Sequence, residues 1–293
     1  MDKLSLEKRK MILSLLVEGS PMRSISRIAD ISINTVTKLL VEAGEASAKY
    51  HDERVQEVKA SRVQCDEIWS FCYAKQKNVN TAKAAPEETG DVWTWTALDS
   101  DSKLIVSYLV GGRDSGYAIE FMDDVRKRLA NRVQLTTDGH KAYLDAVEGA
   151  FGGDVDYAQL VKLYGNSPES MKGRYSPAEC RGTRKNCCSG DPNPKHISTS
   201  HVERQNLTMR MCMIRFTRLT NGFSKKLENH IHMLSLYFVH YNFCRIHKSL
   251  KVTPAMEAGL SDTLHDMEWI VGLIDANKPA PKKRGPYKKR ISN

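Results

Sequence analysis

The sequence lacks any apolar run that approaches the ~20 residues needed to cross a bilayer. Its N-terminus, Met-Asp-Lys-Leu-Ser-Leu-Glu-Lys-Arg-Lys, lacks the apolar stretch of a secretory signal peptide. The seven cysteines are odd in number and scattered, and no two have the Cys-X-X-Cys spacing. These absences argue against a membrane-spanning protein and against a secreted disulfide scaffold. We predict a cytoplasmic protein with reduced thiols and no membrane partner.

Zinc is not indicated either, although one region is rich in its usual ligands. Adjacent cysteines rarely serve together in a tetrahedral site, so these cysteines and histidines give little support for a zinc site. They are Cys180, Cys187, Cys188, His196 and His201.

Acidic residues are also absent from the last sixteen positions, which carry seven of the nine net positive charges of the 293-residue chain. So basic and apolar-poor a segment predicts a disordered tail over 278–293 that contacts DNA phosphates. Arg284, followed by glycine and proline, also resembles an AT-hook, which binds narrow A·T-rich minor grooves. A solvated basic tail without sequence preference is the alternative. The basic residues are Lys278, Lys282, Lys283, Arg284, Lys288, Lys289 and Arg290.

Residues 1–50 have the pattern of a separate helix-turn-helix module. Helices are predicted over 6–17, 22–29 and 33 to about 48, with Ile25, Ile28, Val36 and Leu40 in a small shared core. We expect the last helix to continue as a helical linker over 51–61 and to assist dimerisation. An ordinary three-helix packing unit is the alternative. The polar residues expected to contact DNA from the start of the third helix are Ser32, Asn34, Thr35, Thr37 and Lys38.

The segment 62–260 predicts an α/β core, followed by a C-terminal helix over 261–277. Apolar, β-branched and aromatic runs indicate five strands, and apolar residues at helical spacing indicate the helices between and after them. An irregular insert rich in Gly, Pro, Ser and Cys is expected over 164–196. The predicted strands are 63–73, 92–98, 103–110, a run ending at 136 or 137, and one within 156–163; the helices are 114–130, 141–149, about 198–215 and about 224–242.

Three acidic residues stand in three different local settings. Asp66 lies within the first strand, Asp138 follows the fourth strand, and Glu203 lies on a later amphipathic helix. Such carboxylates can converge, and they are the hard oxygen ligands that Mg²⁺ prefers. The alternatives are a structural ion pair at Asp66, a simple turn at Asp138-Gly139 and a solvated Glu203. Glu169 and Glu179 compete for the third place but lie in the irregular insert.

The sequences around these acids resemble those of the DDE-type transposases and retroviral integrases, in particular bacterial insertion-sequence transposases of the IS-one type. The resemblance covers about residues 1–260. It implies an RNase H-like catalytic core, with a mixed five-stranded sheet flanked by helices. The matching runs are 65–71 (Cys-Asp-Glu-Ile-Trp-Ser-Phe), 91–97, 135–143 (Leu-Thr-Thr-Asp-Gly-His-Lys-Ala-Tyr), 196–206 and 241–250 with Thr-Pro-Ala at 253–255.

The resemblance implies that Asp66, Asp138 and Glu203 are both catalytic and metal-binding. Two Mg²⁺ ions are implied as cofactor, with Mn²⁺ as a substitute, because in-line phosphoryl transfer on nucleic acid uses a metal pair. Arg210, two helical turns after Glu203, is expected to hold DNA, and a simple exposed arginine is the alternative. The residues expected to support the site are Glu67, His140, His201 and Asn206.

We therefore predict a DNA transposase of the bacterial nucleoid that cleaves insertion-sequence ends and transfers the 3′ hydroxyl into target DNA. Double-stranded DNA and a second copy of the chain, as a homodimer or higher oligomer, are the expected partners. A nuclease or resolvase without strand transfer would share the core and its metals. A domesticated DNA-binding regulator would need only the first module, which leaves the three carboxylates unexplained.

Overall fold

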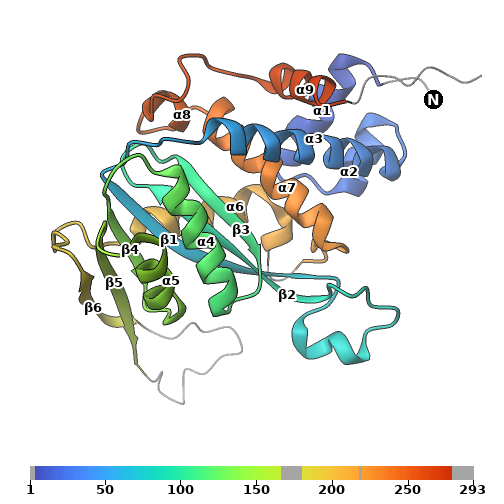
Figure 1. Ribbon diagram of the computed structural model, residues 1–293. Coiled ribbons are helices and arrows are strands. Elements are labelled where there is room, and N and C mark those ends of the chain that lie inside the picture. The colour runs from blue at the N-terminus through green and yellow to red at the C-terminus, as the bar shows by residue number, and fades with distance from the viewer. Residues whose placement is uncertain (1–3, 166–179, 218–219, 279–293) are drawn as a thin grey trace, which may run out of the picture.

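The computed structural model describes residues 4–165, 180–217 and 220–278. Within them the protein is a mixed α/β structure built on one six-stranded sheet with helices on both faces (Figure 1). From edge to edge the strands follow the order β3-β2-β1-β4-β5-β6. Their bounds are β1 Arg62–Cys72, β2 Gly90–Asp99, β3 Ile105–Gly111, β4 Gln134–Asp138, β5 Asp156–Tyr164 and β6 Cys180–Ser189.

The first three strands pair antiparallel, whereas β4 runs parallel to β1 and β5 runs parallel to β4. Parallel neighbours need a crossover connection, and the helices between β3 and β4 and between β4 and β5 supply it. The mixed arrangement of the first five strands confirms the prediction and is consistent with the RNase H-like order that the resemblance implies.

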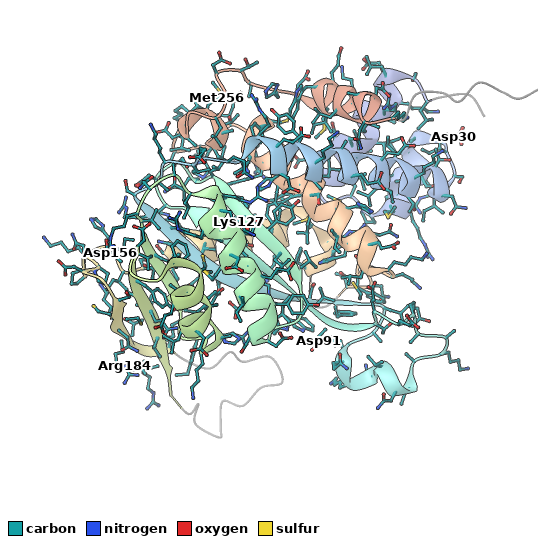
Figure 2. All side chains as sticks on the ribbon, in the orientation of Figure 1. Asp30, Asp91, Lys127, Asp156, Arg184 and Met256 are labelled. Carbon is teal, nitrogen blue, oxygen red and sulfur yellow. The ribbon has the colours of Figure 1, made fainter. Side chains whose placement is uncertain are left out.

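The sixth strand shows that the irregular insert predicted over 164–196 was wrong in part. β5 continues to Tyr164 and pairs antiparallel with β6. β6 is polar and mostly exposed, so it lacks the apolar alternation by which a strand is recognised in sequence. Arg184 marks its place at the outer edge of the sheet (Figure 2), where positive charge discourages pairing with another chain. Residues 166–179, with Glu169 and Glu179, lie outside the described residues.

The helices agree with the predicted positions to within a few residues. The helix expected over 261–277 begins only at Met267. The described residues also form two short 3₁₀ helices, η1 Gln76–Thr81 and η3 Ile214–Phe216, and a π-helical turn, η4 His240–Cys244. The α-helices are α1 Leu6–Val17, α2 Met22–Ala29, α3 Ile33–Arg54, α4 Ser115–Arg128, α5 Ala142–Phe151, α6 Ser200–Cys212, α7 Leu227–Val239, α8 Pro254–Glu257 and α9 Met267–Ala276.

Two apolar clusters hold the layers together. On one face, α4 and α5 cover the sheet, and Phe121 and Tyr143 pack against the fully buried Trp95 at ring distances of 5.8 Å and 5.4 Å. On the other face, α6 and α7 pack against β1 and neighbouring strands through residues such as Val202 and Ile68. Burial of apolar area on both faces is the main stabilising term. It fixes α6 beside the middle of β1.

The N-terminal helices are not a separate unit, contrary to expectation. Their apolar side chains belong to the same cluster as those of α6, α7 and α9. Ile25, Val36 and Leu40 are fully buried as predicted, but Ile28 is 59% exposed. The short helix α2 turns its Ile25 and Ala29 side inward, which leaves Ile28 outside the core.

The predicted helical linker over 51–61 is wrong beyond Arg54, where α3 ends. The chain then becomes extended, and Val58 exchanges backbone hydrogen bonds with the end of α4, from Val58 N to Arg128 O at 2.8 Å and from Ala130 N to Val58 O at 3.0 Å. Val55 and Val58 are fully buried. Their burial beside α4, which requires extended chain, overrides the helical pattern.

Candidate active site

The strand register places Asp66 and Asp138 side by side. β1 and β4 run parallel with Val63 opposite Leu135 and Cys65 opposite Thr137, so the next residue of each strand is an aspartate. One carboxylate oxygen each from Asp66, Glu67 and Asp138 lies within 4.8 Å of the other two. Three carboxylates so close repel one another when ionised, and a divalent cation would relieve that repulsion.

Asp66 faces α6. Its Oδ2 accepts a hydrogen bond of 2.8 Å from Nδ2 of Asn206, which is buried on that helix. Burial, followed by the charges of Glu67 and Asp138, raises the pKa of Asp66 from its ordinary value to about 7. The charge of Glu203 adds to the same effect. The Asp66 carboxyl therefore holds a proton more readily than an exposed aspartate does.

Asp138 is held at the tip of β4 by its own turn. Its Oδ1 accepts a hydrogen bond of 2.9 Å from the backbone N–H of His140. A Cβ at Gly139 would lie only 3.1 Å from the Cγ2 of Val161, so β5 approaches the turn closely. The side chain of Asp138 remains 33% exposed, and its Oδ2 lies 3.9 Å from Arg113 Nη2.

Glu67 points to the opposite face of β1 from Asp66, as the alternation of strand side chains requires. Its Oε1 accepts a hydrogen bond of 2.7 Å from Arg113 Nε, and its Oε2 accepts one of 3.0 Å from the Tyr143 hydroxyl. Burial and the Asp138 carboxylate raise the pKa of Glu67, while Arg113 opposes them. Because both carboxylate oxygens of Glu67 already accept hydrogen bonds, we interpret Glu67 as a neighbour that positions the cluster.

Arg113 was not anticipated from the sequence. It lies between β3 and α4, where its guanidinium covers the Trp93 ring at 4.6 Å and reaches to 3.9 Å from Asp138 Oδ2. The only local signal is an arginine directly after Gly111-Gly112 at the end of a strand. Arg113 supplies positive charge to a site that otherwise collects negative charge.

Glu203 lies one turn before Asn206 on α6 and outside the tight cluster of the described residues. Its Oε2 is 2.7 Å from Lys162 Nζ on β5, and its Oε1 accepts a hydrogen bond from the Thr199 hydroxyl. Burial lowers the pKa of Lys162, but the hydrogen bond and charge of Glu203 outweigh this and raise it. In this arrangement Lys162 neutralises Glu203, and a metal ion would have to displace it.

The two histidines expected near the site differ in position. His140 Nε2 lies 3.9 Å from Glu67 Oε1, beside the carboxylates. The ring of His201 is exposed and interacts with the charges of Lys103, Arg62 and Asp101 instead, and burial together with Lys103 lowers its pKa. Only the backbone of His201 is anchored, through an N–H···Oε1 bond of 2.9 Å to Gln64. Among the described residues, no hydrogen bond or ion pair joins the His201 side chain to Asp66, Asp138 or Glu203, so its expected role at the site stays a prediction.

The residues expected to contact DNA fall into three groups. At the start of α3, Ser32, Asn34 and Lys38 are exposed and Thr35 and Thr37 are half-buried, with the Ser32 hydroxyl capping the helix through Asn34 N. Arg210 is half-buried on α6. Of the tail, Lys278 pairs with Glu42 at 3.2 Å. The other tail residues lie outside the described residues: Lys282, Lys283, Arg284, Lys288, Lys289 and Arg290.

No described helix is both long enough and apolar enough to span a bilayer. No protein-family model and no curated protein matches the sequence. Among solved structures, a piggyBac transposase synaptic complex with hairpin DNA is similar with a TM-score of 0.46 and 9% identity, over 96% of this chain and 75% of that chain.

Two structures of the Mos1 transposase are also similar. A paired-end complex with the left transposon end has a TM-score of 0.22 and 11% identity, over 54% of this chain and 60% of that chain. A mariner paired-end complex with Mn has a TM-score of 0.28 and 8% identity, over 82% of this chain and 76% of that chain. Because all three TM-scores lie below 0.5, the function has to be inferred from this chain's own residues.

Proposed function

We propose that this chain is a DNA transposase that uses Asp66, Asp138 and Glu203 to hold divalent metal. The observation that carries the proposal is the parallel register of β1 and β4, which sets Asp66 beside Asp138. The contact of α6 with Asp66 through Asn206 brings the helix of Glu203 to the same place. The ordered motifs around the three acids, which resemble those of insertion-sequence transposases, supply the reaction class.

The residues present fit a divalent cation. The donors are carboxylate oxygens, which Mg²⁺ and Mn²⁺ prefer, and burial together with neighbouring charge disfavours an ionised Asp66 in the absence of a cation. When bound, a metal pair would lower the pKa of water and stabilise the charge that develops on the reacting phosphate. Asn206 and the His140 N–H orient the two aspartates. Glu67, held by its hydrogen bond from Arg113, lies beside them on the opposite face of β1.

In the proposed reaction, water attacks the phosphodiester at an element end, the P–O3′ bond breaks, and a 3′ hydroxyl is released. That hydroxyl then attacks a target phosphodiester, so that one P–O bond forms as another breaks and no covalent protein–DNA intermediate is needed. Positioning and charge are the protein's contributions to such a transfer. Asn34 and Lys38, exposed at the start of α3, are the side chains we assign to DNA recognition in a helix-turn-helix arrangement.

The test separates binding from chemistry. Asp138→Asn removes one charge while keeping the shape of the side chain, so cleavage and joining of element ends in Mg²⁺ should be lost and DNA binding retained. Asp145→Asn, on the exposed side of α5, is the matched control and should behave as wild type. Normal joining by Asp138→Asn would refute the metal site. A wild-type protein that cleaves ends but never joins a pre-cut 3′ end would instead be a nuclease.

A further inference from the structure

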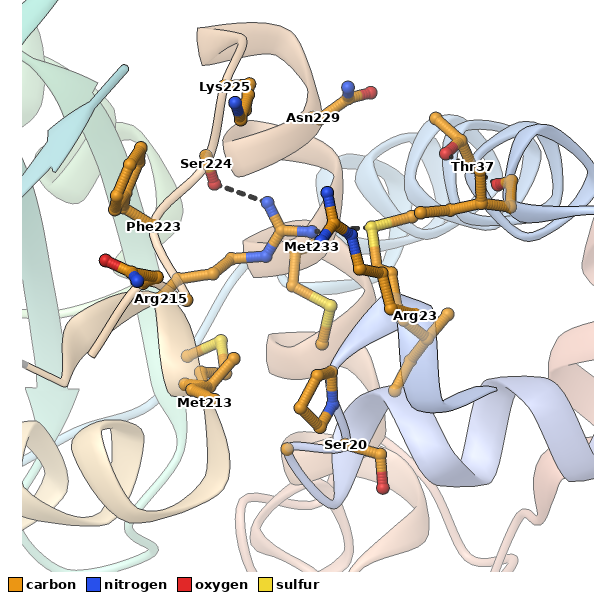
Figure 3. A pocket seen from close by; sticks show the side chains of 18 residues that line it. Ser20, Arg23, Thr37, Met213, Arg215, Phe223, Ser224, Lys225, Asn229 and Met233 are labelled. Carbon is orange, nitrogen blue, oxygen red and sulfur yellow. Dashed lines mark hydrogen bonds between the residues drawn. The ribbon is translucent and has the colours of Figure 1, made fainter. Parts of the chain in front are cut away.

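A cavity of about 670 Å³ lies away from the carboxylates, between the N-terminal helices and α7. Its walls come from α1, α2, the start of α3, η3 and the segment leading into α7 (Figure 3). Three basic side chains line it, Arg23, Arg215 and Lys225, and none of the described residues that line it is acidic. A pocket with several cations and no anion is built for a negatively charged ligand.

Arg215 is the central cation of this pocket. Its Nη1 donates a hydrogen bond to the hydroxyl of the buried Ser224, and its Nη2 lies 3.7 Å from the Met22 sulfur, a weak acceptor. Within the described part of the chain no carboxylate lies within ion-pair distance of it. Burial lowers the pKa of Arg215 to about 10, so the guanidinium stays charged at neutral pH without a counter-ion.

The hydrogen-bonded side chains behind Arg215 carry no charge that could neutralise it. Ser224 Oγ lies 3.3 Å from His230 Nδ1, and His230 Nε2 lies 3.3 Å from Ser70 Oγ. Burial and the charge of Arg215 lower the pKa of His230 to about 3, so its ring is uncharged at neutral pH. This network holds the guanidinium in place without neutralising it.

Arg23, on α2, provides the second charge. Its side chain is exposed at the mouth of the cavity, and Figure 3 shows the Arg23 and Arg215 guanidinium groups directed into the cavity from different elements. Like charges that line one cavity repel each other, and an anion bound in the cavity relieves that repulsion. Planar guanidinium forks match the oxygens of a phosphoryl group.

We propose that this cavity binds a phosphodiester group of the DNA backbone. The choice of DNA rests on the function proposed above and on what adjoins the cavity. On one side Ile33 and Thr37 belong to the start of α3, which we assign to recognition. On the other side Ser224 O accepts a hydrogen bond of 2.8 Å from Tyr73 N, just past the end of β1.

The distance from the cavity to the carboxylates is short enough for one DNA duplex to contact both. Cys72, which pairs with Ser224, lies six residues after Asp66 on β1, and strand geometry makes that separation about 20 Å. DNA that enters along α3 can therefore occupy the cavity and reach Asp66 without leaving the protein surface. The pocket would fix the register of the duplex and carry no sequence information.

Binding of the full-length protein to duplex DNA across a salt series tests the proposal. Removing one phosphate-binding charge should reduce the slope of log affinity against log salt by about 0.9, so that affinity at 50 mM salt falls about threefold more than affinity at 200 mM. We expect this change for Arg23→Gln and Arg215→Gln. Arg215→Lys should have a smaller effect, because it keeps the charge. Lys127→Gln, an exposed charge change on α4 across the sheet, is the control.

Arg23 is exposed, so its variant should fold even if Arg215→Gln does not. Slopes for Arg23→Gln equal to those for Lys127→Gln would overturn the proposal. A second result would also overturn it: the variants bind DNA as wild type does, and inorganic phosphate raises the melting temperature of wild type but not of Arg215→Gln. The cavity would then be a site for a small free anion. Failure of the proposed transposase function would give a different result: wild type would not join DNA ends, while Arg23→Gln would still reduce the salt dependence of DNA binding.

Discussion

The side-chain amide of Asn206 donates a hydrogen bond of 2.8 Å to Asp66 across 140 residues of sequence. This contact ties α6 to the centre of β1. Because Asn206 is buried, its amide has little freedom to turn away. The position of Asp66 therefore depends on a helix that also carries Glu203.

We expect Asn206→Ala to weaken metal binding, because a partner that orients a ligand typically contributes 10- to 100-fold in metal affinity. The Mg²⁺ concentration that gives half-maximal joining should rise by roughly that factor. Thr208→Ala on the same helix removes a hydroxyl that donates a hydrogen bond to the Arg204 carbonyl, and it should leave the Mg²⁺ requirement unchanged. An equal Mg²⁺ requirement in Asn206→Ala and wild type would show that the hydrogen bond is incidental.

Asp66→Asn should raise stability in the absence of metal. Burial and neighbouring carboxylates raise the pKa of Asp66 to about 7, so the ionised side chain destabilises the fold near neutral pH. Removing the charge should stabilise the metal-free protein by about 1 kcal/mol or more, measured by urea unfolding at pH 8. Added Mg²⁺ should stabilise the wild type and not the variant; an equal Mg²⁺ effect on both would contradict the assignment of Asp66 as a ligand.

The carboxylate cluster was foreseeable in part because its backbone is specified locally. Apolar runs fix β1 and β4 as strands, and parallel pairing then leaves little choice about where Asp66 and Asp138 meet. Arg113 and Lys162 were not foreseeable. Each is a long, flexible side chain whose partner is chosen by tertiary geometry, and no periodicity marks it.

Two errors in the fold have a similar cause. β6 is held by backbone pairing to β5 and has no buried face, so hydrophobic patterning could not reveal it. The early end of α3 is set by burial of Val55 and Val58 against distant residues. In both cases long-range contacts override a local preference.

Arg113→Gln should destabilise the protein through Glu67, whose side chain is only 1% exposed. Loss of a charged hydrogen bond to a buried group costs about 2 kcal/mol, because the carboxylate is left without its counter-ion. The double variant Arg113→Gln/Glu67→Gln should recover most of that stability, as a double-mutant cycle by chemical denaturation would show. Additive destabilisation would mean that Arg113 acts through Trp93 alone.

Acid should destabilise this protein through its buried histidines. Burial lowers the pKa of His51 to about 4 and that of His230 to about 3, whereas both would have a pKa near 6.5 in the unfolded chain. The unfolded state therefore binds more protons between pH 6.5 and these values, and stability falls as pH falls through that window. Each histidine should contribute a decrease of about 2 kcal/mol in the free energy of unfolding between pH 7.5 and pH 5.

Urea midpoints at pH 7.5 and pH 5 measure this effect. His51→Gln removes one of these titrating groups along with its hydrogen bond to the Ile105 carbonyl, so it should be less stable than wild type at pH 7.5 but should be destabilised less by acid. His196→Gln changes an exposed ring and should keep the wild-type difference between the two pH values. If acidification destabilises His51→Gln and His196→Gln equally, then His51 is not the buried neutral group that its surroundings indicate.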